Sequence, residues 1–231
     1  MEGLESATAW VRRTLGCRVG DGALLAEALT HRSAQGANNE RLEYLGDAVL
    51  SFVVAEMLFH AHPGATEGEL SRYRASLVSG ETLGALALEL GLGEHIRLGE
   101  GELKSGGFRR ASILADALEA VIGAIYLDLG IDAARGAVGR LLADRLVALP
   151  SASELKDPKT RLQERLQASG IPLPAYEVAE VSGEPHAQRF VVRCRVDSLG
   201  LLAEAAGTSR RRAEQEAASR LLERLDAESG Q

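Results

Sequence analysis

The chain has 231 residues, of which 45% are apolar and 26% are charged, and this ordinary balance excludes a wholly disordered protein. Its formal net charge of −7 excludes nucleic-acid binding through overall charge, so such a surface requires local clusters of basic residues. Cys17 and Cys194 lie far apart and outside any CxxC pair, which argues against a disulfide framework and a zinc site. We therefore expect a reducing, cytoplasmic environment. No run of about 18 apolar residues occurs, so we expect no membrane span.

The first part of the chain, residues 1–149, shows apolar spacing that is mostly helical. A long helix is predicted over 39–58, and two more are predicted at 111–130 and 131–149. The segment 98–110 is rich in glycine and interrupts the pattern, so we expect a mobile loop there. Because no strong strand signal is present, this part is predicted to be an all-α domain.

The second part of the chain has a different residue pattern, with a polar segment followed by helix-like and strand-like stretches. Residues 150–155 are mostly polar and begin with a proline, which is typical of a linker between domains. The elements predicted after it are a helix at 159–170, strands at 175–183, 188–198 and 200–208, and a helix at 209–227. Residues 156–227 are therefore predicted to form an α+β domain with the order α-β-β-β-α.

Three acidic residues share one face of the helix predicted over 39–58. Glu40, Glu43 and Asp47 are spaced i, i+3 and i+7, and the same face continues into apolar positions. Ionised carboxylates are costly to bury unless a cation or hydrogen-bond donors compensate them. An alternative stays open at this point, in which Glu40 and Glu43 belong to a solvated first turn favoured by the helix dipole.

A second acidic pair, Asp116 and Glu119, lies on one face of the apolar helix at 111–130. If the two acidic faces pack together, four or five carboxylates converge and repel one another unless a cation neutralises them. Mg²⁺ binds oxygen ligands and is the usual ion where phosphates are handled. Such an ion can activate water and stabilise a phosphoryl displacement. The spacing therefore points to metal-dependent chemistry on phosphates.

Two long blocks resemble the ribonuclease III family. The stretch NERLEYLGDAVL is similar to the family's signature segment, and LKSGGFRRASILADALEAVIGAIYLDLG is similar to its second block. Further along, DPKTRLQERLQ and SRRRAEQEAA resemble the family's double-stranded RNA-binding domain. The resemblance spans residues 5–226 and implies the short bacterial form, with one ribonuclease III nuclease domain and one RNA-binding domain.

The resemblance implies an Mg²⁺-dependent endoribonuclease, with Mn²⁺ able to substitute and no organic cofactor, that cuts double-stranded RNA. It implies a homodimer in which each site cuts one strand and leaves 5′-phosphate and 3′-hydroxyl ends with short 3′ overhangs. The implied substrates are ribosomal RNA precursors and messenger RNA. A second hypothesis, from a different class, is a catalytically silent protein that only holds duplex RNA. The complete set of acidic residues argues against it.

The resemblance also assigns roles to residues of the first domain. Metal binding goes to four carboxylates, Glu43, Asp47, Asp116 and Glu119. Among them Asp47 and Glu119 rank first as catalytic residues. The cleft around them is assigned to Asn39, Glu40 and Lys104. Tyr44 stands where the family usually has a phenylalanine that inserts into the partner subunit, so we expect it at the dimer interface.

In the second domain, the resemblance assigns RNA contacts to three elements. These are Thr160, Gln163 and Glu164 on the first helix, Pro185 and His186 in a hairpin loop, and Arg210, Arg211 and Arg212 at the start of the last helix. A reader of duplex RNA needs polar groups for the minor groove and a basic element at a fixed separation. An arginine run alone is more typical of a solvated surface, but the ordered match of all three elements favours RNA binding. Because residues 151–231 have 12 basic against 13 acidic side chains, Glu214 among them, we expect weak, salt-sensitive binding.

Overall fold

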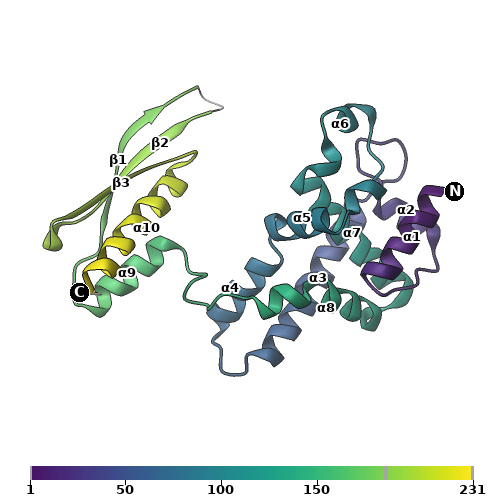
Figure 1. Cartoon of the computed structure of the whole chain (residues 1–231), viewed down its shortest axis with the longest axis horizontal. Helices are drawn as coiled ribbons and strands as arrows, with labels where there is room; N and C mark the ends of the chain where they lie inside the picture. Colours follow the sequence, from purple (N-terminus) through teal and green to yellow (C-terminus); the bar gives the residue numbers. More distant parts are fainter. Residues whose placement is uncertain (1, 185–186, 230–231) are drawn as a thin grey trace. The chain divides into compact units, whose positions relative to one another are not determined.

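Two compact units make up the chain, residues 1–150 and 151–231, and each has a hydrophobic core of its own. The computed structural model, drawn in Figure 1, describes residues 2–184 and 187–229. Pro185 and His186, two of the predicted RNA contacts, lie outside the described residues. The fold class predicted for each unit is confirmed.

The first unit is helical. Its helices are α1 (Glu2–Thr14), α2 (Gly22–Ala28), α3 (Glu40–Ala61), α4 (Glu67–Leu77), α5 (Gly80–Glu89), α6 (Glu100–Lys104), α7 (Ala111–Leu129) and α8 (Ile131–Val147), with short 3-10 turns η1 (Leu92–His95) and η2 (Gly107–Arg109). Its described residues pair in strand fashion only at one isolated bridge, between Thr30 and Arg97. Local capping explains several helix starts: the Asp21 carboxylate accepts two backbone N–H groups of α2, and Thr66 and Glu69 form a capping box at α4.

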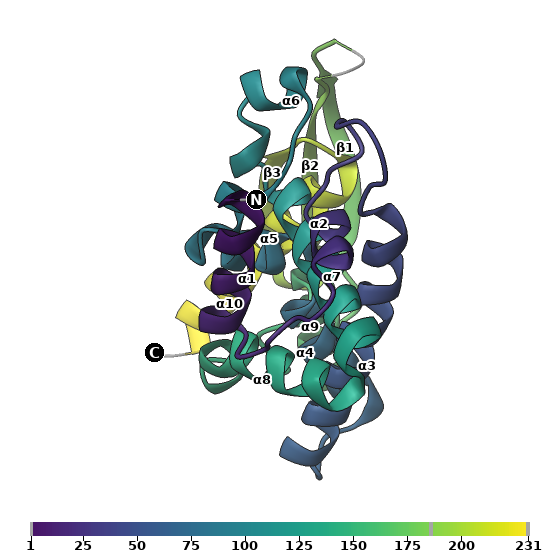
Figure 2. The ribbon, with the colours of Figure 1, turned by 90° about the vertical axis from the view of Figure 1, so that its right-hand side faces the viewer.

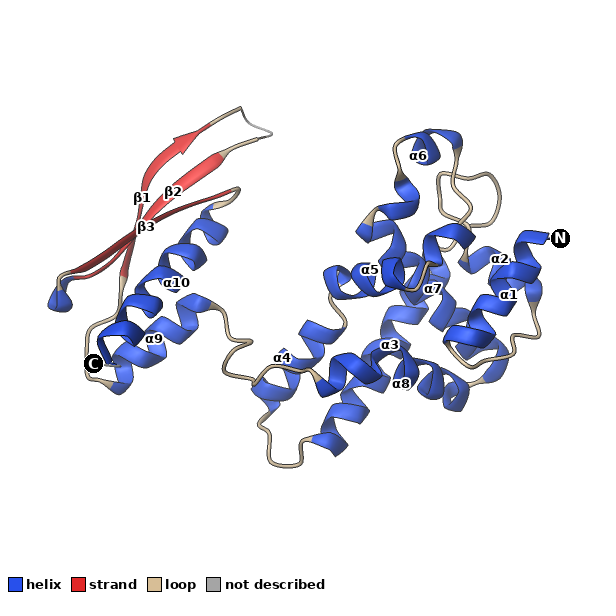
Figure 3. Ribbon diagram, in the orientation of Figure 1, coloured by secondary structure: helices blue, strands red, loops and turns tan. Residues whose placement is uncertain are grey.

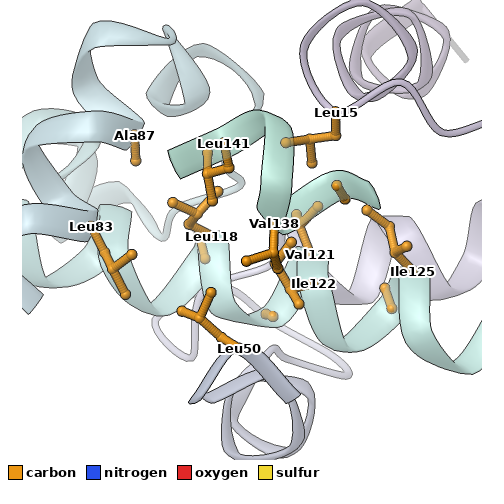
Figure 4. Close-up of a cluster of buried hydrophobic side chains, with 14 of the residues drawn as sticks. Leu15, Leu50, Leu83, Ala87, Leu118, Val121, Ile122, Ile125, Val138 and Leu141 are labelled. Carbon is orange, nitrogen blue, oxygen red and sulfur yellow. The ribbon is translucent and has the colours of Figure 1, made fainter. Parts of the chain in front are cut away.

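Helix α7 lies at the centre of this unit, because its sequence is apolar on nearly every side. Most residues between Ile113 and Ile125 are buried. Figure 4 shows Leu118 and Ile122 of α7 packed among side chains of α3, α5 and α8. Full burial of each such side chain contributes about 1.5–3 kcal/mol, so α7 is a rigid base for any polar group on it.

The prediction of a mobile loop at 98–110 is wrong, because this segment folds into α6 and η2. The N–H of Gly99 donates to the Ser33 hydroxyl at 3.0 Å, and the Arg110 guanidinium lies 2.9 Å from the Glu102 carboxylate. A Cβ atom on Gly99 would lie 2.1 Å from the carbonyl oxygen of Ser33. Glycine at this position therefore permits close packing of backbone segments, where the sequence pattern suggested mobility.

The second unit has the predicted order α-β-β-β-α. Its elements are α9 (Pro158–Ala168), β1 (Ala175–Ser182), β2 (Arg189–Val196), η3 (Asp197–Leu199), β3 (Leu201–Gly207) and α10 (Arg210–Ser229). The strands form an antiparallel sheet in the order β1-β2-β3, and both helices cover one face of it (Figure 3). Val192, Cys194 and Val196 of β2 are buried while the residues between them are exposed, as their alternation predicts.

Residues 151–156 form hydrogen-bonded turns ahead of α9, including one from the Glu154 N–H to the Ser151 carbonyl at 3.0 Å. The linker expected at 150–155 stays a prediction. Among the described residues, no helix has the length and apolar character that a membrane crossing needs.

Candidate active site

The contact between α3 and α7 depends on two glycines. A Cβ atom on Gly46 would lie 1.8 Å from the carbonyl oxygen of Glu119, and one on Gly123 would lie 2.4 Å from that of Leu42. Only residues without a side chain allow the two backbones to come this close. Glu43 lies about one helical turn before Gly46. The crossing therefore brings the acidic face of α3 against the acidic face of α7.

Three of the predicted carboxylates converge at this crossing. One carboxylate oxygen from each of Glu43, Asp116 and Glu119 lies within 4.8 Å of the others, and all three residues are partly buried. Three oxygens at this separation can hold one divalent ion between them. This arrangement overturns the alternative of a solvated first turn for Glu43, although Glu40 remains exposed.

The electrostatics of the three acids show the strain of bringing like charges together. The pKa of Glu119 is raised to about 7, first by burial and then by the negative charges of Asp47, Asp116 and Glu43. Burial is also the main cause that raises the pKa of Glu43 and of Asp116. A bound cation would offset both the cost of burial and the repulsion between the negative charges. The three carboxylates are therefore suited to holding a metal ion.

Asp47 occupies a different position from the other predicted ligands. It is exposed on α3 and is not one of the three converging residues. After burial, however, its charge is the largest contribution to the raised pKa of Glu119. The structure therefore places the two residues ranked first as catalytic within electrostatic reach of each other, with Asp47 on the exposed side.

A cavity of about 820 Å³ opens beside these acids. Its lining consists of His31, Arg32, Ser33, Asn38, Asn39, Glu40, Glu43, Glu102, Arg110, Ser112, Ile113 and Asp116. Asn39 is almost fully buried, and its Nδ2 atom has no hydrogen-bond partner among the described residues. A buried amide donor is costly without an acceptor, so Asn39 fits a site where a substrate or water oxygen supplies one.

Of the residues predicted to line the cleft, Glu40 lines the cavity and Lys104 does not. The Glu40 carboxylate lines the cavity and lies 3.6 Å from the Arg32 guanidinium. Lys104 ends α6, its ammonium lies 3.5 Å from the Glu100 carboxylate, and it is not among the described residues that line the cavity. The structure thus brings Asn39 and Glu40 to the acidic cluster and leaves Lys104 on the neighbouring α6 segment.

Sequence reasoning missed the cationic side of this cavity and the crossing glycines. His31, Arg32 and Arg110 come from segments that carry no recognisable spacing relative to the acids, so no pattern identifies them. Gly46 does have a signal, because a glycine inside a strongly apolar helix costs about 1 kcal/mol and calls for a packing reason.

An exposed aromatic row follows the outer face of α3. Tyr44, Phe52 and Phe59 have 82%, 54% and 65% of their surface exposed, and their spacing of eight and seven residues keeps them on one side of the helix. Helix α3 runs along one side of the first unit (Figure 2). Large exposed aromatic groups in a row are unusual on a monomer and mark an interaction surface.

Six of the predicted RNA contacts lie among the described residues of the second unit, at the starts of its two helices. Thr160, Gln163 and Glu164 are exposed on the first turns of α9, where the Thr160 hydroxyl donates to Asp157 at 2.7 Å. The Glu164 carboxylate pairs with the Lys156 ammonium.

At the start of α10, Arg210, Arg211 and Arg212 are all exposed, and the Arg212 N–H donates to the Ser209 hydroxyl at 3.2 Å. The Lys159 ammonium in the first turn of α9 donates to the Glu214 carboxylate near the start of α10 at 2.6 Å, so the two groups of predicted contacts lie on one side of the unit.

Known proteins match both units. Residues 21–146 match a family model described as ribonuclease-III-like, and residues 158–225 match the double-stranded RNA binding motif. Curated relatives named Ribonuclease 3 include one from Alkalilimnicola ehrlichii, 58% identical over 92% of this chain and 93% of its own, and one from Nitrosococcus oceani, 57% identical over 94% of each. The solved nuclease domain of ribonuclease III from Campylobacter jejuni is 44% identical with a TM-score of 0.56, covering 58% of this chain and 95% of that one. The chain belongs to the ribonuclease III family.

Proposed function

We propose that this member of the ribonuclease III family cuts double-stranded RNA with Mg²⁺, or with Mn²⁺ in its place, and leaves 5′-phosphate and 3′-hydroxyl ends with short 3′ overhangs. The observation that carries the proposal is the convergence of Glu43, Asp116 and Glu119 beside a polar cavity, on a chain that also has a double-stranded RNA binding motif. Oxygen ligands of this kind are those that Mg²⁺ prefers. A catalytically silent protein would have no use for three acids held at such electrostatic cost.

A divalent ion held by these acids would neutralise their charge, activate water and stabilise negative charge on the phosphate group. We assign the metal-binding role to Glu43, Asp47, Asp116 and Glu119, with Asp47 and Glu119 as the catalytic residues. Glu119 holds a cation in its ionised form. Its pKa of about 7 belongs to the metal-free site, and a bound cation would lower it.

The residues around the acids complete the proposed site. Asn39 offers its unpartnered Nδ2–H group to an oxygen in the cavity, and Glu40 acts on water at the rim. Lys104, at the end of α6, is assigned to the RNA strand beside the cleft. The cations that line the cavity, Arg32 and Arg110, offset the repulsion between the acids and an incoming phosphate.

Residues at the starts of α9 and α10 form the proposed RNA-binding surface, with Pro185 and His186 of the hairpin loop added from the resemblance. Thr160, Gln163 and Glu164 supply polar groups suited to the minor groove, and the three arginines at 210–212 supply charge for phosphates. The exposure of all six described residues supports this assignment, since none has to be uncovered before it meets RNA.

A homodimer through the outer face of α3 is the proposed assembly. The Campylobacter jejuni relative has a region involved in dimer formation within its nuclease domain. A two-fold dimer uses the same patch on both copies, and the row of Tyr44, Phe52 and Phe59 offers a self-complementary apolar patch. Tyrosine at position 44 keeps the aromatic ring and adds a hydroxyl that needs a partner or water.

We further propose that the enzyme acts in the cytoplasm on precursor ribosomal RNA and messenger RNA. The two cysteines support a reducing compartment, because both are free thiols buried within their units. The domain limits proposed for this activity are 1–149 for the nuclease and 156–227 for the RNA-binding domain.

Incubating the purified chain with a long RNA duplex and Mg²⁺ tests this function. The proposed activity predicts short duplex products with 5′-phosphate and 3′-hydroxyl ends. It predicts no products when EDTA removes the metal. A matched DNA duplex serves as the control and should stay intact. A retarded RNA band without products in Mg²⁺ would instead support the catalytically silent alternative.

A further inference from the structure

A charge cluster joins α9 to α10, and it links Arg210 of the proposed RNA surface to two residues not yet assigned a role, Glu214 and Lys159. Glu214 of α10 is only 8% exposed, and its carboxylate accepts from two cations. Lys159 Nζ donates to Oε2 at 2.6 Å, and Arg210 Nε donates to Oε1 at 2.8 Å. One acid therefore ties the first turn of α9 to the first turn of α10 through two charge-assisted hydrogen bonds.

Lys159 is held from a second direction as well. Its ammonium lies 4.4 Å from the centroid of the Tyr176 ring on β1, at cation–π distance. About a third of the Lys159 side chain and nearly two-thirds of the Arg210 side chain stay exposed. The two cations are thus fixed in place by the protein while part of each still reaches solvent, beside Thr160 and Arg211 of the proposed RNA surface.

Glu214 is ionised despite its burial. Burial alone would raise the pKa of Glu214, but the hydrogen bonds from Lys159 and Arg210 outweigh it, and the pKa lies below its ordinary value. The three groups together keep one net positive charge. Burying the ionised Glu214 carboxylate costs more than packing an apolar side chain there, so stability of the fold alone does not explain it.

We propose that Glu214 is a positioning residue for RNA binding, and that Lys159 is a further residue that contacts phosphate. Glu214 holds Lys159 and Arg210 side by side at the surface, so both reach the RNA backbone with their side chains already ordered. Ordering a long side chain before binding removes an entropy cost that would otherwise reduce affinity. The inference rests on the proposed RNA surface at the starts of α9 and α10.

The variant Glu214→Gln distinguishes an effect of positioning on RNA affinity from an effect of net charge. The substitution removes one negative charge, so an effect of net charge alone would tighten RNA binding. Positioning predicts the opposite, a loss of about tenfold in affinity and a salt slope shallower by about 1. The matched control is Glu204→Gln, which removes the same charge and breaks the pair that Glu204 makes with Arg193 at 2.7 Å on the exposed face of the sheet.

The assay is fluorescence anisotropy of the full chain with a labelled RNA duplex, in EDTA to prevent cleavage, over a series of salt concentrations. Thermal unfolding of each variant shows whether the second unit still folds. If Glu214→Gln unfolds it, Lys159→Gln replaces it, because Glu214 then keeps Arg210 as its partner. Lys159→Gln should also make the salt slope shallower by about 1.

Binding by Glu214→Gln as tight as that of Glu204→Gln, with an equal salt slope, would overturn the proposal. So would an unchanged salt slope in Lys159→Gln. Arg211→Gln tests the surface itself. If it weakens binding while the other two variants do not, only the role of Glu214 and Lys159 fails. If it also leaves affinity unchanged, the proposed RNA surface fails with them.

Discussion

Replacing Gly46 with alanine tests whether the close crossing of α3 and α7 builds the site. The added Cβ would start 1.8 Å from the Glu119 carbonyl oxygen, whereas ordinary contact needs at least 3.4 Å. The obstacle is backbone, which cannot swing away as a side chain can. The helices must therefore separate, and Glu43 moves away from Glu119 as they do.

The size of both effects follows from this geometry. Overpacking a core contact costs about 1–3 kcal/mol, and the better helix propensity of alanine returns about 1 kcal/mol of it. A misplacement of about 1 Å in a catalytic group lowers the rate about 100-fold. Gly46→Ala should therefore lose modest stability and at least that factor in turnover, because the separation it requires is larger than 1 Å.

The assay compares turnover of a short RNA duplex with the thermal midpoint of unfolding. Gly136→Ala in α8 is the matched control, since nothing lies within 4 Å of a Cβ there. It should gain about 0.5–1 kcal/mol from helix propensity and keep full activity. Wild-type turnover in Gly46→Ala would refute the reasoning, because it would show that the site tolerates a wider crossing.

Two further predictions concern metal binding and assembly. The folded-state pKa of Glu119, about 7, lies above its ordinary value of 4.5, so the metal-free protein loses stability as pH rises from 4.5 to 7. Mg²⁺ needs the ionised acids, so the rise in melting temperature that it causes should be larger at about pH 8 than at about pH 5.5; equal rises would contradict the site. Phe52→Glu should convert the proposed dimer to a folded monomer in analytical ultracentrifugation, because it puts a charge in the apolar row. The control is Val147→Glu, at a side chain 91% exposed at the end of α8, which should leave the association state unchanged. If the Phe52→Glu variant is still a dimer, the interface lies elsewhere.

The sequence predicted the fold class of both units because hydrophobic periodicity carries that information. Helix α7 is apolar on nearly every side and becomes the centre of its unit. Strand β2 alternates buried and exposed residues, as a strand with one face on the core requires. The segment 98–110 failed the same reasoning. In the sequence its glycines indicate a flexible loop. In the folded chain they allow close contacts between backbone segments, such as that of Gly99 with Ser33.

The candidate site was predictable in its residue types and less so in its geometry. Spacing predicted that Glu43, Asp116 and Glu119 would converge if the two helices packed by their acidic faces, and the structure shows that packing. It could not show that Asp47 stands apart from the closest group, because that depends on where α3 crosses α7 at Gly46. Glu214 illustrates the same limit. In the sequence it is a charge that weakens an arginine run, whereas in the fold it holds Arg210 and Lys159.

The most direct test of the metal centre is the activity of Glu119→Gln in Mg²⁺. Glutamine keeps the shape of the side chain and removes the charge at the most perturbed carboxyl of the cluster. The site predicts that cleavage of an RNA duplex is abolished while duplex binding in a gel assay stays near the wild-type value. Glu81→Gln, at an exposed position in the first turn of α5, should cut normally. Unchanged cutting by Glu119→Gln would contradict the assignment of the active site to these acids.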